Sequence, residues 1–379
     1  MLNEYLDKLM QRIDLTRVEA EEVAERAVDG ADPHQVAALL ALLRAKGETA
    51  EEVSGMAAAL QRRARRMAAG DDLVDTCGTG GDGAHSINIS TGAAILAAAC
   101  GLRVAKHGNR SVSSRCGSAD VLEALGVAID LPPGAVTRCL NEVGIAFLFA
   151  PSYHPALRIL APVRRGLAIR TVLNLLGPLL NPAGTRRQVL GVAHPRLVPL
   201  LAEALQRLGA EHALVVHAGG MDELTPTAVA ECLEVRPDGV RELRLDPIEL
   251  GVPPCRPEEL TGGEPAENAL RLRRALEGEA GAVSDAIALN AGAALYVAGR
   301  SRSVRAGVEA ARETLAAGGA AATLDRWIAR SRALAAEAAV EAVVAMILPI
   351  LLPFNLLKAG INSIIIFLIY KPIARFLHK

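Results

Sequence analysis

The sequence has 379 residues, which is enough for one large domain or two unequal ones. Hydrophobic residues make up 51% of it and aromatics only 3%, so a sizeable core can form, but Ala, Leu and Val must fill it. The formal net charge of -1 argues against a general nucleic-acid binder, because such proteins usually carry a basic excess.

The first 70 residues predict a helical domain. The opening MLNEYLDKLM carries acidic residues and no apolar run, so we expect no signal peptide. Asp32 followed by Pro33 is typical of a helix start, and Thr49–Glu52 forms a capping box that opens a helix to about Met67. The basic run at 61–66 fits a solvated helix face better than a nucleic-acid patch.

After Gly70, short apolar runs alternate with helical ones. We expect strands at 73–76, 102–105, near 145–149, 189–193, 212–217 and 231–235, and a last helical stretch at 266–335. This alternation predicts an α/β fold with a mainly parallel sheet, whose loops gather at the carboxyl ends of the strands. The expected domains are a helical one at 1–70 and an α/β one at 71–338, with some helices near 153–185 able to join the helical domain.

A glycine-rich loop, GTGGDG at 78–83, follows the first predicted strand. Its glycines let backbone N–H groups approach an anion without interference from a Cβ. The loop also satisfies the G-x-G-x-x-G pattern of dinucleotide sites, which needs an acidic residue about 20 positions later, at the end of the second strand. Because that strand runs into Lys106 and His107 instead, the pattern favours a phosphate ligand over a nicotinamide cofactor.

Two further polar segments follow. NIST at 88–91 enters a helix, where Ser or Thr is usually an N-cap, but a helix N-terminus beside a glycine loop also binds anions. Ser90 could do both and hold a metal through its hydroxyl. KHGNRSVSS at 106–114 is either a solvated loop or a pyrophosphate clamp, in which charged donors neutralise a leaving group.

Two later segments carry charge. Asp222 and Glu223, in GMDE after a predicted strand, are either exposed turn residues or ligands of Mg²⁺, which prefers hard oxygens and keeps several waters. VRRGLAIRT at 163–171 holds several arginines. They are either surface residues of a helix or residues whose guanidinium groups bind a carboxylate through two hydrogen bonds.

Together these segments resemble the anthranilate phosphoribosyltransferase family of tryptophan biosynthesis. The strings DTCGTGGDG, NIST, KHGNRSVSS, CGSADVLEALG, APVRRGLAIRTVLNLLGPLLNP and GMDELTPT are similar to its signature strings, in its order, and the resemblance spans about residues 2–335. It implies a small N-terminal helical domain plus a large α/β domain, as in class II pyrimidine nucleoside phosphorylases, and usually a homodimer.

The six cysteines have no metal-site spacing, so we expect reduced thiols in a cytoplasmic protein.

The resemblance also implies site residues. Phosphoribosyl pyrophosphate would be bound by Gly78, Gly81, Asp82, Ser86, Asn88, Ile89, Ser90, Thr91, Lys106, His107, Gly108, Asn109, Arg110, Ser111, Val112, Ser113, Ser114 and Ser118. Ser90, Asp222 and Glu223 would hold Mg²⁺. Anthranilate would face Gly78, His107, Asn109 and Arg164, and catalytic roles would fall to Lys106, His107, Asn109 and Arg164.

The reaction implied by the resemblance joins the anthranilate amine to the anomeric carbon with loss of pyrophosphate. An aromatic amine is neutral at pH 7, so we expect catalysis by positioning and leaving-group stabilisation. Two other functions stay open: a pyrimidine nucleoside phosphorylase-like enzyme and a non-catalytic nucleic-acid-binding relative. The segments at 106–114 and 163–165 argue against the first, and the acidic pair with the near-neutral charge argues against the second, so no nucleic-acid partner is expected.

The composition changes near residue 340. Three of the six lysines and three of the five phenylalanines lie beyond it, and two uncharged runs, 343–357 and 359–370, flank Lys358. Together these runs approach the ~20 residues of a membrane helix. The tail at 339–379 is foreign to the family, and its segment at 352–377 resembles the last transmembrane stretch of the substrate-binding subunit of energy-coupling-factor vitamin transporters. It is either a chimeric or mis-joined reading frame, which the abrupt change favours, or a real membrane or partner anchor.

Overall fold

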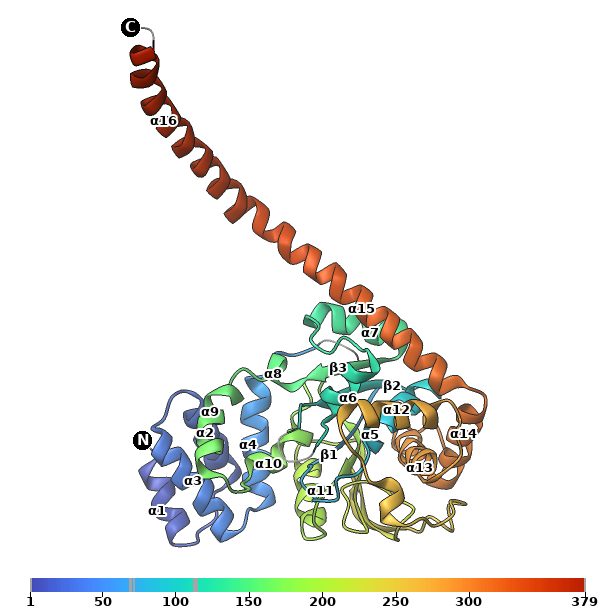
Figure 1. Ribbon diagram of the computed structural model, residues 1–379. Helices are drawn as coiled ribbons and strands as arrows, with labels where there is room; N and C mark the ends of the chain where they lie inside the picture. Colours follow the sequence, from blue (N-terminus) through green and yellow to red (C-terminus); the bar gives the residue numbers. More distant parts are fainter. Residues whose placement is uncertain (1, 68–69, 71, 112–114, 378–379) are drawn as a thin grey trace. The chain divides into compact units, whose positions relative to one another are not determined.

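The computed structural model divides the chain into two compact units, Met1–Ser331 and Arg332–Lys379 (Figure 1). It describes residues 2–67, 70, 72–111 and 115–377, apart from the side chains at 348, 376 and 377. Each unit is described by itself below.

The first unit begins with a bundle of helices, as expected. Its members are α1 (Asn3–Met10), α2 (Arg17–Val28), α3 (Pro33–Lys46) and α4 (Ala50–Arg62), joined later in the chain by α8 (Ala150–Tyr153), α9 (Leu157–Leu167) and α10 (Leu173–Leu176). The Asp32 cap and the Thr49–Glu52 capping box are both formed, although α4 ends at Arg62 rather than near Met67. Helix α9 packs on α2 and α3, and α10 packs on α4.

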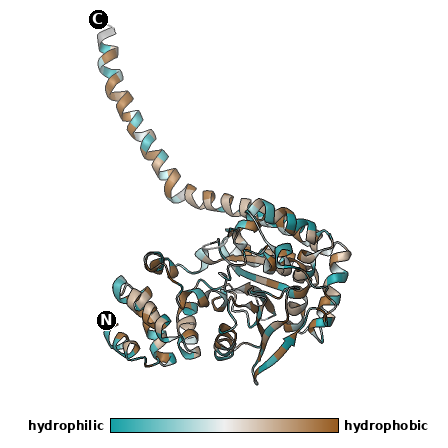
Figure 2. Cartoon of the chain, turned by 60° about the horizontal axis from the view of Figure 1, so that its bottom comes forward, coloured by the Kyte–Doolittle hydropathy of each residue, from teal (hydrophilic) through white to brown (hydrophobic). Residues whose placement is uncertain are grey.

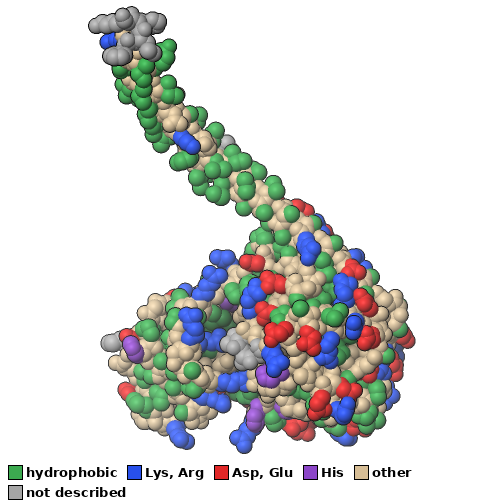
Figure 3. Space-filling model, in the orientation of Figure 1, with side chains coloured by type: hydrophobic (Ala, Val, Ile, Leu, Met, Phe, Trp, Pro, Cys, Tyr) green, Lys and Arg blue, Asp and Glu red, His purple; other side chains and the backbone are tan. Residues whose placement is uncertain are grey.

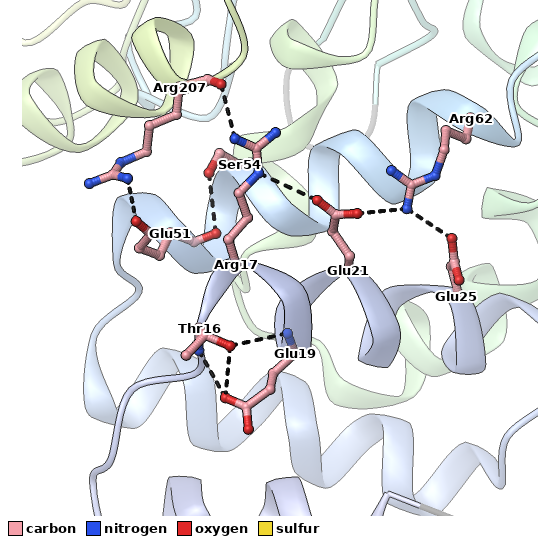
Figure 4. A network of polar contacts seen from close by, with 9 residues as sticks. All are labelled: Thr16, Arg17, Glu19, Glu21, Glu25, Glu51, Ser54, Arg62 and Arg207. Carbon is pink, nitrogen blue, oxygen red and sulfur yellow. Dashed lines mark hydrogen bonds and ion pairs between the residues drawn. The ribbon is translucent and has the colours of Figure 1, made fainter.

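A polar network fastens this bundle to α11 (Leu197–Arg207) of the α/β region (Figure 4). Arg17 donates to the Arg207 carbonyl oxygen at 3.2 Å, and the Arg207 guanidinium pairs with Glu51 of α4. Within the bundle, Arg62 bridges α4 to Glu21 and Glu25 of α2, at 2.8 and 2.9 Å. Each exposed ion pair contributes little to the free energy of folding. The main effect of the network is therefore to fix the orientation of α11 relative to the bundle.

The α/β region is built on a seven-stranded sheet in the order β3-β2-β1-β4-β5-β6-β7. The strands are β1 (Leu73–Gly78), β2 (Arg103–Gly108), β3 (Ile145–Phe149), β4 (Arg187–Gly191), β5 (His212–Ala218), β6 (Ala230–Arg236) and β7 (Gly239–Leu245). The first five pair in parallel, and β6 and β7 add an antiparallel edge. The mainly parallel sheet is confirmed, and β7 is an addition to the expected strands.

Two strands run further than the sequence indicated. Strand β1 continues to Gly78, and β2 continues to Gly108, where Lys106 and His107 are paired with Phe147 and Leu148 of β3. Lys106, His107 and Gly108 are therefore strand residues, and the expectation of a loop from residue 106 is wrong. A lysine can occupy this buried strand position because buried oxygen atoms accept hydrogen bonds from its amino group.

Further helices pack on the sheet or on one another around it. They are α5 (Ile89–Ala99), α6 (Ser118–Leu125), α7 (Pro133–Val143), α12 (Pro265–Leu276), α13 (Ala282–Val297), α14 (Val304–Ala316) and the start of α15 (Gly319–Met346), with short 3₁₀ turns η1 (Gly177–Leu179) and η2 (Pro257–Leu260). Helix α5 is apolar almost all round because it packs on β1, β2 and α13 together. Its alanines and Gly92 permit this close packing, since a Cβ at Gly92 would lie 2.7 Å from the Ile287 side chain.

The second unit is helical. It comprises the end of α15, a π-helical turn η3 (Ile347–Leu351) and α16 (Leu352–Leu377). The turn coincides with Pro349 and lies just before Pro353, two residues that lack the N–H needed for a regular helix. Among the described residues, one helical stretch, Gly319–Arg375, is long and apolar enough to cross a membrane. The transporter-like origin of this tail stays a prediction.

Candidate active site

Three polar segments meet at the carboxyl edge of the sheet. Asp222 follows β5, and its Oδ2 accepts a hydrogen bond from the backbone N–H of Gly80 at 2.6 Å. Glu223 accepts at Oε1 from the backbone N–H of Ser90, in the first turn of α5, at 2.9 Å. The Asp222 N–H in turn donates to the Asp82 carboxylate at 3.4 Å. The glycine loop, the start of α5 and the acidic pair thus form one site.

Two glycines make this meeting possible. At Gly78, the last residue of β1, an added Cβ would lie 2.2 Å from Asp222 Oδ2, and at Gly191, the last residue of β4, it would lie 1.4 Å from the Asp222 carbonyl oxygen. Any larger residue at either strand end would push the acidic loop away. Gly191 was missed by the sequence analysis, because its need for glycine arises only from the approach of residue 222.

The acidic group is buried and carries an excess of negative charge. Burial, with the neighbouring Asp82 carboxylate, raises the pKa of Asp222 to about 7. Burial and the Asp222 charge raise the pKa of Glu223 well above its ordinary value. Glu223 Oε2 is buried and has no hydrogen-bond partner among the described residues. A cation bound beside these buried carboxylates would offset their negative charge and give Glu223 Oε2 a partner.

The donors suit a hard divalent ion. Carboxylate oxygens and the Ser90 hydroxyl are the oxygen ligands that Mg²⁺ prefers. Within the described ranges, no three His, Cys, Asp or Glu side chains are grouped to hold an ion by themselves. Mg²⁺ tolerates this, since it usually retains waters and takes substrate phosphate oxygens as further ligands.

Lys106 lies beneath these loops, with only 1% of its surface exposed. Its Nζ donates to the Thr76 carbonyl oxygen at 2.7 Å and to the Ser90 hydroxyl at 3.4 Å. Burial lowers the pKa of Lys106, and the carboxylates of Asp75 and Glu223 oppose that shift. A buried lysine amino group therefore lies beside the first turn of α5.

His107 is held as a neutral ring. Its Nδ1 lies 3.1 Å from the Gly177 carbonyl oxygen, which fixes the proton on Nδ1. Its Nε2 is buried and has no partner among the described residues. Burial, with the nearby His154, lowers the pKa of His107 to about 3, and burial lowers that of His154 to about 4. The two rings meet edge to face with centroids 5.1 Å apart.

The residues after Gly108 fold back toward α6. Arg110 pairs with Asp120 and Glu123, so its charge is already balanced. The Ser111 N–H donates to Asp120, and the Ser118 hydroxyl donates to the Asn109 carbonyl oxygen at 3.2 Å. Residues 112–114, which complete the predicted clamp, lie outside the described residues.

The other predicted ligands of the diphosphate line the start of α5. Asn88 is tied down, since its amide donates to the Cys116 carbonyl oxygen and its Oδ1 accepts from Asn268, both at 3.1 Å. Ile89 is buried, and the Thr91 hydroxyl is buried without a partner among the described residues. Ser86 pairs with Thr261 in an isolated bridge. These contacts hold the helix start in place.

Two arginines differ in their surroundings. Arg164, near the end of α9, is exposed as a whole residue, yet partial burial of its guanidinium lowers its pKa, and it has no ion pair within the described part of the chain. Arg170 donates to the carbonyl oxygens of Gly80 and Gly81, at 2.6 and 2.7 Å, and so straps the glycine loop. Arg170 belongs to the arginine segment at 163–171, which was expected to hold surface residues or groups that bind a carboxylate, whereas its contacts here are with backbone carbonyl oxygens. His154 lies outside every motif found in the sequence.

A cavity of about 360 Å³ lies elsewhere, near the amino end of β4, and is lined by residues such as Met67, Asn181 and Arg186. None of the predicted site residues lines it. The candidate site therefore rests on converging polar groups at the carboxyl edge and not on the size of a hollow.

Family models match both parts of the first unit. One described as "Glycosyl transferase family, helical bundle domain" covers residues 3–64, and one described as "Glycosyl transferase family, a/b domain" covers 70–321. The chain is 50% identical over 342 residues to the anthranilate phosphoribosyltransferase of Rubrobacter xylanophilus, covering 89% of this chain and 100% of the relative. It is 44% identical over 335 residues to that of Chlamydia felis, covering 88% and 98%.

Solved structures agree. The anthranilate phosphoribosyltransferase of Thermus thermophilus superposes with a TM-score of 0.82 at 46% identity, covering 86% of this chain and 99% of that one. The Saccharomyces cerevisiae enzyme "in complex with PRPP and Mg" gives a TM-score of 0.80 at 24% identity, covering 88% and 98%, a likeness that bears on the fold alone.

Proposed function

This chain belongs to the anthranilate phosphoribosyltransferase family, and we propose that the converging loops at the carboxyl edge of its sheet carry out the family's reaction. The enzyme transfers the phosphoribosyl group of phosphoribosyl pyrophosphate to the amine of anthranilate and releases pyrophosphate. The observation that carries the assignment to this edge is the pair of contacts from Asp222 to Gly80 and from Glu223 to Ser90.

Ser90, Asp222 and Glu223 would hold Mg²⁺. The support is the unpartnered Oε2 of Glu223, the raised pKa of both carboxyl groups and the oxygen-only donor set. When bound, the ion would neutralise charge on the diphosphate as a Lewis acid. The yeast enzyme named above was solved with the same ion and the same phosphoribosyl donor.

The diphosphate itself would lie on the glycine loop and the start of α5. Backbone N–H groups of residues 78–83 and the helix N-terminus favour an anion at this place. Lys106, held by Thr76 and Ser90, would place a positive charge close to the leaving group. The ligands proposed from the motifs are Gly78, Gly81, Asp82, Ser86, Asn88, Ile89, Ser90, Thr91, Lys106, His107, Gly108, Asn109, Arg110, Ser111 and Ser118, with residues 112–114 beyond the described part. Among them Arg110 would act through the loop's shape, since its charge is already paired.

Anthranilate would enter beside Gly78, His107 and Asn109. The Arg164 guanidinium, which has no ion pair among the described residues, would form two parallel hydrogen bonds with the anthranilate carboxylate. The neutral His107 ring offers an unpartnered Nε2 that can accept a hydrogen bond from the amine. Catalysis would then come from holding a neutral amine in line with the anomeric carbon while the departing diphosphate is neutralised.

A homodimer in the cytoplasm is the assembly that we propose. Three large apolar side chains of the helical bundle, those of Met10, Ile13 and Val18, are exposed within nine residues, and a second copy would cover them. The six cysteines, all of them among the described residues, form no disulfide bond, which agrees with a reducing compartment.

The test is a fluorescence assay that follows the loss of anthranilate with phosphoribosyl pyrophosphate and Mg²⁺. We expect turnover that needs all three components. A protein that cleaves thymidine or uridine with phosphate, and leaves anthranilate untouched, would overturn the proposal in favour of a nucleoside phosphorylase.

A further inference from the structure

The tail helix is apolar on every side over the stretch from Ile364 to Tyr370. From Ile364 to Tyr370, seven consecutive residues of α16 have large apolar or aromatic side chains that are 47–70% exposed. Successive helix residues are about 100° apart, so seven of them cover the whole circumference. Figures 2 and 3 show hydrophobic residues recurring along this helix.

A protein partner would leave part of this surface in water. A groove or a neighbouring helix covers one stripe of a helix, typically the residues at every third and fourth position. From Ile364 to Tyr370 the positions outside any such stripe are equally apolar. A helix that lies flat on a membrane surface would also expose its outer side, because such helices need one polar face. Only a surrounding hydrocarbon phase covers all sides at once.

The length and the charges fit a bilayer. Residues 351–370 number 20 and would extend about 30 Å, the thickness of the hydrocarbon core. Lys358 is the one charge among them, and its long stem allows the ammonium group to reach toward the membrane surface. No acidic residue follows Glu341, whereas Tyr370, Lys371 and Arg375 mark the far end, as aromatic and basic residues do at membrane interfaces.

Two polar side chains within this stretch, those of Asn355 and Ser363, form hydrogen bonds within the helix itself. The Asn355 amide donates to the Leu351 carbonyl oxygen at 2.8 Å, and the Ser363 hydroxyl donates to the Ala359 carbonyl oxygen at 2.9 Å. In hydrocarbon an unsatisfied polar group is unfavourable, so these internal hydrogen bonds make insertion of the helix less unfavourable.

We propose that residues 351–370 span a lipid bilayer and tether the catalytic unit to a membrane. The tether follows from the exposed side chains whatever the origin of the segment, and it does not rest on the reaction proposed above. The catalytic unit would remain in water, since its relatives match the chain without this tail.

Flotation tests the tether directly. The full chain, purified in mild detergent, is reconstituted with neutral phosphatidylcholine vesicles and centrifuged upward through a density gradient. We expect most of the protein to float and to stay with the vesicles after a high-salt wash and an alkaline carbonate wash. Protein that stays at the bottom, or that salt releases, would overturn the proposal, as would protein that sediments as aggregates.

Variants make the test specific. The double substitution Ile361→Lys with Ile365→Lys places two charges near the middle of the span and should lower the floated fraction severalfold, whereas Ile361→Leu with Ile365→Leu should float like the parent. A chain ending at residue 338 should not float. Equal flotation of the lysine variant would contradict insertion. Anthranilate turnover, measured in each preparation, separates failure of the tether from failure of the proposed reaction.

Discussion

The carbonyl oxygen of Asp222 lies against Gly191, so close that a Cβ added to the glycine would be 1.4 Å away. Two strand ends, those of β1 and β4, are thus shaped around a single residue of the acidic loop. Movement of this loop would alter both the proposed metal ligands and the backbone of the glycine loop, to which Asp222 is hydrogen-bonded.

Replacing Gly191 with Ala should displace the 220–223 loop and lower kcat/KM by roughly 100-fold or more, the size of loss seen when charge-stabilising groups at a site are misplaced. Steady-state kinetics at saturating Mg²⁺ measure the effect. Gly134→Ala is the matched control, because nothing lies within 4 Å of a Cβ at this helical position. Near-normal kinetics for the Gly191 variant would show that the loop can yield without loss of function.

Asp222→Asn with Glu223→Gln removes the buried negative charge and keeps the shapes of the side chains. We expect Mg²⁺-dependent turnover to fall by roughly two orders of magnitude or more. Thermal stability without metal should hold or rise, because both carboxyl groups have raised pKa values and their ionised forms oppose folding at neutral pH. Asp238→Asn, at an exposed turn, is the control. Full turnover in the double variant would remove both residues from the metal site.

Arg164→Ala should raise the KM for anthranilate by roughly tenfold or more while kcat changes less, because a charged hydrogen bond to the substrate is lost. Arg164→Lys should fall between the two, since it keeps the charge but loses the fork. The neighbouring Arg165→Ala serves as the control. If KM for anthranilate is unchanged in both Arg164 variants, the carboxylate is recognised elsewhere.

Acid should destabilise the catalytic unit through two buried histidines. In the unfolded chain each takes up a proton near pH 6.5, whereas burial lowers the pKa of His107 to about 3 and of His154 to about 4 in the fold. The unfolded state therefore binds more protons below about pH 6.5, and stability present above this pH is lost as the pH falls toward 4.

Urea unfolding between pH 8 and pH 5 measures that loss. His154→Gln should flatten the decline over this window, whereas substitution of the exposed His34 by Gln should leave it unchanged. An identical slope in the His154 variant and the parent would show that other groups control acid stability.

Local patterns predicted most of the fold. The alternation of apolar runs located β1 to β6, and cap residues located the starts of α3 and α4. Strand β7 was missed because its side chains are largely exposed and charged, as in RELR at 241–244, which resembles a loop. Strand β2 was ended too early because Lys106 and His107 are atypical of a buried strand, and their partners come from residues distant in sequence.

The candidate site was predictable only where motifs lie along the chain. Glycine loop, helix start and acidic pair were each visible as short strings, and their meeting followed from the parallel sheet. Arg170 lies in the arginine segment at 163–171, but its partners could not be predicted, since they are 89 and 90 positions away in the sequence. The pairing of Arg110 with Asp120 and Glu123 could not be predicted either, because a sequence motif shows which residues are cationic but not which of them form ion pairs.

The contacts that close the site join residues 142 and 133 positions apart, Gly80 to Asp222 and Ser90 to Glu223. Strand β4 lies between β1 and β5 in the sheet, and the acidic pair follows β5. The ribosome must therefore synthesise the chain past residue 223 before the site can bind a substrate. Ligand binding by a growing chain would therefore report that β4 and β5 have joined the sheet, and a fragment ending before residue 222 should not bind phosphoribosyl pyrophosphate even where its first helices have folded.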